Sequence, residues 1–147
     1  MGTRSLTTFI DQADTNTYVK RNKIVTMYRQ YDGNPKNHGL ELAEFLASGK
    51  MVNGFGSDTE ERLFNGMGCL AAQAISHFKG NKVGGIYLYR GGTINVDENY
   101  RYEVLSNGEG KNVTLRCYEV HNKAKLLFEG TPHEFIKIFK VVKTPMA

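Results

Sequence analysis

Residues 84–130 contain four strand-like segments separated by short turns, and this pattern constrains the fold more than any other feature of the sequence. The segments are GGIYLYR (84–90), NYRYEVL (99–105), NVTLRCYEV (112–120) and AKLLFEG (124–130). They are rich in β-branched and aromatic residues, and their connections are rich in Gly, Asn and Asp, which favour turns. Because short connections join antiparallel neighbours, the sequence predicts an antiparallel meander over 84–130.

The rest of the chain adds two strands and the helices. SLTTFI (5–10) and KIVTMYRQ (23–30) predict an N-terminal hairpin over 3–31. LELAEFL predicts a helix at about 40–48. A longer helix at about 58–79 is predicted from the helical repeat of Phe64, Met67, Ala71, Ala74 and Phe78. Thr131, Pro132 and Glu134 form a capping-box start, which predicts a last helix over 131–142.

These elements predict an α+β fold, with a mainly antiparallel sheet, two or three helices packed on one face, and one compact domain over residues 1–147. A chain of 147 residues suits a single domain. Its apolar runs are shorter than the ~18–20 residues needed to span a bilayer, so we expect no membrane segment.

Several chemistries lack their usual sequence signals. The histidines show no HExxH or paired-Cys spacing, and Cys69 and Cys117 lie far apart, as expected for reduced thiols. GxSxG and P-loop motifs are absent. Asp32 and His38 are one candidate acid–base pair, although Asp32-Gly33 followed by Asn34-Pro35 is more simply a turn. We therefore expect no metal, no cofactor, no catalytic residue and no enzymatic activity.

Alternation along the strands sorts their side chains into two faces. If the apolar sets share a core, the other face carries Tyr87, Tyr89, Asn99, Arg101, Thr114, Arg116 and Tyr118. Flat rings and guanidinium groups together suit a nucleotide, because rings stack on Tyr and guanidinium binds phosphate. The alternative is an ordinary solvated sheet face, where Tyr, Thr and Arg are all common.

The order of four motifs resembles that of a small family of phage proteins, the anti-Thoeris sponges. The motifs are YRQYDGNPKNHGLELAEFL, NGMGCLAAQAISHFK, GGIYLYRGG and NYRYEV, and the resemblance covers residues ~25–120. Proteins of that family bind the cyclic ADP-ribose signal of bacterial TIR-domain defence enzymes without degrading it, and some hold cyclic oligonucleotides. The resemblance implies a phage anti-defence protein that acts in the host cytoplasm.

The resemblance also implies a ligand pocket between protomers, contacted by a ring, an amide and arginines. The positions that match are Tyr89, Asn99 and Arg116, although the family carries Phe where Tyr89 stands. Arg101 joins them from the sorting of faces, and the segment MYRQYDGNPKNHG (27–39) adds Tyr28, Arg29 and Asp32. A dimer or higher homo-oligomer is expected, because a shallow face needs a partner to enclose a ligand.

Other function classes remain open from the sequence. Residues 111–147 are mildly basic, so a single-stranded nucleic-acid binder that uses the same Tyr/Arg face is the main alternative. A cyclic-nucleotide hydrolase and an accessory protein that binds only other proteins are two more. A sponge, unlike a hydrolase, returns its ligand chemically unchanged.

Overall fold

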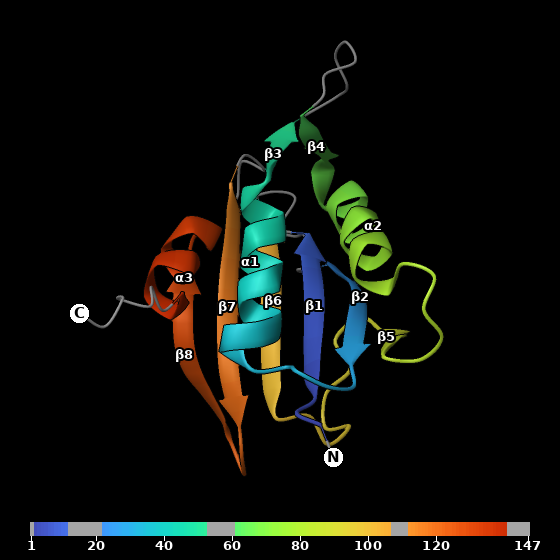
Figure 1. Ribbon diagram of the computed structural model, residues 1–147, viewed down its shortest axis with the longest axis vertical. Coiled ribbons are helices and arrows are strands. Elements are labelled where there is room, and N and C mark those ends of the chain that lie inside the picture. The colour runs from blue at the N-terminus through green and yellow to red at the C-terminus, as the bar shows by residue number, and fades with distance from the viewer. Residues whose placement is uncertain (1, 12–21, 53–60, 107–111, 141–147) are drawn as a thin grey trace, which may run out of the picture.

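The fold is a six-stranded sheet with three helices on one side, as Figure 1 shows for a computed structural model that describes residues 2–11, 22–52, 61–106 and 112–140. The strand order is β5-β2-β1-β6-β7-β8. The strands are β1 (Ser5–Asp11), β2 (Asn22–Arg29), β5 (Ile86–Arg90), β6 (Tyr100–Ser106), β7 (Val113–Val120) and β8 (Ala124–Gly130). The predicted α+β class, the mainly antiparallel sheet and the single compact domain are confirmed.

Strand pairing agrees with the sequence prediction except at β5. β1 and β2 form the antiparallel hairpin, and β6, β7 and β8 form the meander. β5 instead pairs with β2 at the far edge, and β1 pairs in parallel with β6. The meander prediction is therefore wrong for β5. The connection 91–99 can reach ~30 Å, which is enough to cross the roughly 14 Å that separates β5 from β6.

The helices follow from local signals. A π-helical turn (η1, Pro35–Gly39) runs directly into α1 (Leu40–Ala47), and α3 covers Pro132–Phe139. The predicted capping box of α3 is present: Glu134 N donates to Thr131 Oγ1 (3.1 Å), and Thr131 N donates to Glu134 Oε1 (2.9 Å). Residues 141–142 of the predicted helix lie outside the described residues.

The long helix begins later than predicted. α2 covers Gly66–Lys79, and Arg62–Asn65 form strand β4, which pairs in parallel with β3 (Gly49–Val52). Gly66 has a φ of 80°, a left-handed conformation that ends the strand and turns the chain into the helix. Phe64 is buried in the same core as α2, which explains why it fitted the helical repeat. Residues 58–60 of the prediction lie outside the described residues.

The two faces of the sheet differ in what covers them. Figure 1 shows α1, α2 and α3 all on one side, which we call the helix face. Its strand residues are buried under the helices and include Thr7, Met27, Tyr102, Cys117 and Phe128. We call the other side the open face. Only the connection between β5 and β6, residues 91–99 (the crossover segment), is seen to cross it in the described parts of the chain.

Candidate functional site

The open face carries two rows of side chains that run across all six strands. Register aligns the first row as Tyr87, Tyr28, Leu6, Arg101, Tyr118 and Leu126. It aligns the second as Tyr89, Thr26, Thr8, Glu103, Arg116 and Glu129. Four of the predicted site residues, Tyr28, Tyr89, Arg101 and Arg116, therefore lie on the same face of the sheet. Between the tyrosines and the arginines this face is buried, at Leu6, Thr8 and Thr26.

Three tyrosines gather at the β5 end of these rows. The Tyr28 ring centroid lies 6.3 Å from that of Tyr87 and 5.8 Å from that of Tyr89, which meets it edge-on. Tyr87 is 47% exposed and Tyr89 is 40% exposed. Burial raises the pKa of Tyr28 above its usual value, so its hydroxyl stays neutral. The result is an uncharged aromatic surface that is open to a planar group.

Arg101 is held by the crossover segment. Its Nε donates to Glu98 Oε2 (2.6 Å), and a terminal nitrogen donates to Asn95 Oδ1 (3.1 Å). Glu98 also accepts from the backbone N–H groups of Asn95 and Val96. Burial alone would raise the pKa of Glu98, but the hydrogen bond from Arg101 and the backbone N–H groups together lower it. Glu98 is thus an ionised carboxylate that fixes the crossover segment to β6.

Arg116 lies between two carboxylates. It pairs with Glu129 through Nε and with Glu103 through a terminal nitrogen at 3.4 Å. Tyr118 donates its hydroxyl hydrogen to the same Glu103 oxygen (3.2 Å). Burial would lower the pKa of Arg116, but the hydrogen bonds and the negative charge of its partners raise it. Its charge is therefore balanced within the protein.

A cavity of about 240 Å³ lies between the crossover segment and the open face. Thr8, Arg101, Glu103 and Tyr118 line its floor, and residues 92–94 form its roof. Lys23 stands at the same cavity and, among the described residues, has no carboxylate partner. The crossover segment passes so close to β2 that a Cβ added at Gly91 would lie 1.9 Å from Lys23 O. Sequence reasoning missed Lys23, and the Gly91-Gly92 pair was the signal for this close approach.

Asn99 has a structural task at the end of the face. Its Oδ1 accepts from Arg4 N (3.0 Å), and its own N–H donates to Arg4 O (2.9 Å). Val120 N also donates to Asn99 O (2.8 Å). These bonds tie the start of β1 to the start of β6. The amide oxygen of Asn99 is therefore already used inside the protein.

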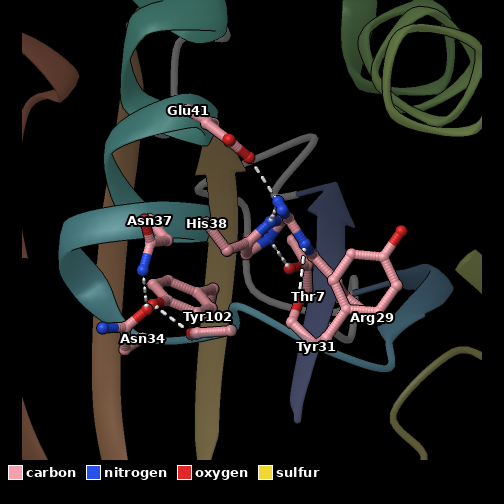
Figure 2. A network of polar contacts seen from close by, with 9 residues as sticks. Thr7, Arg29, Tyr31, Asn34, Asn37, His38, Glu41 and Tyr102 are labelled. Carbon is pink, nitrogen blue, oxygen red and sulfur yellow. Dashed lines mark hydrogen bonds and ion pairs between the residues drawn. The ribbon is translucent and has the colours of Figure 1, made fainter. Parts of the chain in front are cut away.

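Arg29, which was predicted as a site residue from the segment 27–39, lies on the helix face and not with Tyr89, Arg101 and Arg116. It is paired in register with Ser5 and Ile86 on the helix face. Figure 2 shows its guanidinium between Tyr31, His38 and Glu41. Nε donates to Tyr31 O (2.8 Å), and one terminal nitrogen contacts both Glu41 and His38 Nδ1 (3.2 Å). Alternation along β2 places Tyr28 on the open face and its neighbour Arg29 on the helix face.

His38 is fully buried and neutral. Because Arg29 can only donate, His38 Nδ1 must accept, and its Nε2–H then donates to Thr7 Oγ1 (2.8 Å). Burial, and then the positive charge of Arg29, lower the pKa of His38 to about 3. Both ring nitrogens are engaged, which removes the candidate acid–base pair with Asp32.

Asp32 shapes the turn that places His38. It has a φ of 56°, and its backbone oxygen accepts from His38 N (2.9 Å). The hydroxyl of Tyr102 donates to Gly33 O (2.7 Å) in the same turn (Figure 2). The polar groups of residues 27–39 therefore serve mainly to anchor β2 to η1 and the sheet. Asp32 is exposed and does not join the open-face residues.

Other kinds of site find no support among the residues the structure describes. No group of three or more His, Cys, Asp or Glu side chains is placed to hold a metal ion there. In the same residues, no helix is long and apolar enough to cross a membrane. Cys69 and Cys117 are both free thiols.

No protein-family model, curated protein or solved structure matches this chain.

Proposed function

We propose that this chain is a phage anti-defence protein that binds a cyclic nucleotide signal, of the cyclic ADP-ribose type, and sequesters it without degrading it. The supporting observation is the open face, where three clustered tyrosine rings share a surface with Arg101, Arg116 and a cavity that Lys23 borders. The motif order supports the phage setting and action in the host cytoplasm.

Each part of the face has a role in this proposal. Tyr89, with Tyr28 and Tyr87, stacks on the adenine ring, where a stacking contact contributes about 1–3 kcal/mol. Lys23 and Arg101 meet the phosphate oxygens at the cavity, and Arg116 stands beside it. Asn99 contributes its N–H₂ group, because its oxygen is bonded to Arg4.

The charge balance of the face favours a compact ligand over a polynucleotide. Three cations, Lys23, Arg101 and Arg116, stand against three carboxylates, Glu98, Glu103 and Glu129. Nucleic-acid binding depends on releasing counterions with many uncompensated cations. A face whose arginines are already paired gains little in this way, so stacking and hydrogen bonds carry the recognition. The nucleic-acid alternative is therefore the weaker of the two.

A second protomer completes the proposed site. The tyrosine cluster is wide and exposed, whereas small-molecule sites usually bury most of the ligand. A homo-oligomer that brings a second surface over β5 would enclose the ligand.

Capture and release test the proposal directly. Purified protein is incubated with cyclic ADP-ribose, separated from free ligand, denatured by heat, and the supernatant is analysed by mass spectrometry. We expect depletion of the free ligand and full recovery of unchanged ligand. Recovery of a hydrolysed product would establish an enzyme instead, and no depletion would reject this ligand.

Variants locate the binding surface. Tyr89→Ala is expected to weaken capture about tenfold, from the loss of a stacking contact. Arg116→Gln is expected to weaken it less, because Glu103 and Glu129 already balance its charge. Ile138→Ala changes an exposed apolar residue on α3 and should leave binding unchanged. Equal effects at Tyr89 and Ile138 would remove the open face as the site.

Oligonucleotide titrations separate the two candidate functions. A single-stranded nucleic-acid binder gains affinity with oligonucleotide length and loses it steeply with salt. We expect neither for this protein with 5- to 20-nucleotide strands.

A further inference from the structure

A second cavity lies on the helix face and does not involve the open-face residues. It measures about 340 Å³ and opens where β2 ends, β5 begins and α2 reaches its C-terminal end. Arg29, Lys79 and Lys82 line it together with a single carboxylate, Glu41. Phe78 and Tyr31 provide ring surfaces in its wall. The cavity is therefore net positive, with room for more than a simple ion.

Two hydrogen bonds, one to the backbone and one to a buried ring, hold Arg29 in this cavity. Its Nε is bonded to Tyr31 O, and one terminal nitrogen is bonded to the buried Nδ1 of His38. Its side chain is only 11% exposed. Among the described residues its other terminal nitrogen has no hydrogen-bond partner. This N–H₂ group is a preorganised donor for an anion.

Glu41 is the one replaceable partner of Arg29. Its side chain is 52% exposed at the start of α1, where few contacts fix it. A carboxylate on Arg29 occupies the place that the anionic group of a ligand would take. A ligand phosphate that takes the place of Glu41 keeps a negative charge beside the mostly buried Arg29, so Glu41 can swing into solvent without leaving that guanidinium uncompensated.

Two lysines also line the cavity. Lys79 donates to Gly84 O (3.0 Å) and Ile86 O (2.9 Å), which holds its ammonium group in place. The negative end of the α2 dipole partly compensates Lys79, so Arg29 and the exposed Lys82 provide most of the attraction. One guanidinium and two ammonium groups at the same cavity match the several oxygens of a phosphate group.

We propose that this cavity binds a small organic phosphate monoester, whose phosphate replaces Glu41 on Arg29 and is also met by Lys82. The organic part of the ligand packs on Phe78 and Tyr31. The two cavities have no lining residue in common. Tyr87 of the open face does lie near this site, with its ring centroid 5.5 Å from Lys79 Nζ, so Tyr89 is the open-face residue that separates the two sites.

Isothermal titration with 5′-AMP at pH 7.5, where the phosphate is a dianion, tests the proposal. Because Glu41 competes with the ligand, Glu41→Gln is expected to tighten binding about fivefold. Glu44→Gln changes another exposed carboxylate of α1 and is the matched control, expected to have no effect. Lys82→Ala is expected to weaken binding about fivefold.

Three outcomes would overturn the proposal, two of them at the cavity itself and one at the open face. One is no tighter binding in Glu41→Gln than in Glu44→Gln, and the other is wild-type affinity in Lys82→Ala. Tyr89→Ala keeps the helix-face cavity intact and must retain AMP binding. Loss of AMP binding in Tyr89→Ala alone would place the nucleotide on the open face and reject the helix-face site. Inorganic phosphate, titrated in parallel, is expected to bind more weakly because it lacks the ring contacts.

Discussion

His38 has a pKa far below its ordinary value, and this makes the stability of the protein depend on pH. The unfolded chain protonates this ring near pH 6.5, whereas the folded chain does so only near pH 3. Protons therefore favour the unfolded state between these values. We expect the free energy of unfolding to fall by up to about 1.4 kcal/mol per pH unit as the pH drops from 6.5 to 5.

Denaturant unfolding at pH 7.5, 6.5, 5.5 and 5 measures this slope. His38→Gln should be less stable at pH 7.5 but have a flatter profile. His77→Gln, which alters an exposed ring, should keep the wild-type slope. A profile for His38→Gln as steep as that of the wild type would assign the slope to another group.

Tyr102 is the second residue with a buried polar task. Its hydroxyl donates to Gly33 O at 2.7 Å, in a place where its ring is 1% exposed. Tyr102→Phe leaves this carbonyl without its donor and is expected to cost about 1–3 kcal/mol of unfolding free energy. Tyr87→Phe removes an exposed hydroxyl and should cost little. Urea midpoints of the two variants measure these costs. Equal midpoints would mean that the Tyr102 hydroxyl does not stabilise the fold.

Residue-level prediction from sequence worked where alternation alone sets the outcome. Tyr89, Arg101 and Arg116 were placed together because each lies in a regular strand, and register did bring them to one face. The sequence did not predict that Glu98, Glu103 and Glu129 would balance the arginines, because pairing depends on which strands become neighbours. Arg29 was taken from the segment 27–39 and not from the sorting of faces, and register places it on the helix face.

At the scale of elements, α2 contains two glycines that substitution by alanine should affect in opposite directions. Gly66 has a φ of 80°, which a residue with a Cβ adopts only at a cost of about 1–2 kcal/mol. Gly68 lies inside the helix, and an added Cβ would meet no other atom within 4 Å. We expect Gly68→Ala to stabilise the protein by up to about 1 kcal/mol and Gly66→Ala to destabilise it. Thermal midpoints that move in the same direction for both variants would contradict this account.

The capping box at the start of α3 provides a second stability test at this scale. Thr131 and Glu134 exchange the two bonds of a capping box, so Thr131→Ala is expected to cost about 1 kcal/mol. Thr131→Ser retains the hydroxyl and should keep most of that stability. The starts of α1 and α3 were both predicted correctly. For α3 the reason is that four consecutive residues form the capping box. The start of α2 was not predicted correctly, because it depends on a left-handed glycine at the end of β4.

For the whole molecule, the crossover segment decides the strand order that the sequence failed to predict. Short turns usually join antiparallel neighbours, but 91–99 carries the chain from the sheet edge to its centre. The segment is held by Glu98 to Arg101 and by Gly92 N to Thr26 Oγ1 (3.0 Å). These contacts involve β2 and β6, which lie far apart in the sequence, so no local pattern encodes them.

We therefore expect Glu98 to stabilise both the position of the crossover segment and the proposed ligand cavity. Glu98→Gln removes a charge that is 1% exposed and leaves Arg101 uncompensated, which should cost about 1–3 kcal/mol. Amide hydrogen exchange should speed up most at Asn95 and Val96, whose N–H groups donate to Glu98. Asp97→Asn alters a carboxylate that is 89% exposed and should change neither quantity much. Unchanged exchange at residues 95 and 96 in Glu98→Gln would mean that backbone packing at Gly91, rather than this carboxylate, fixes the crossover segment to the open face.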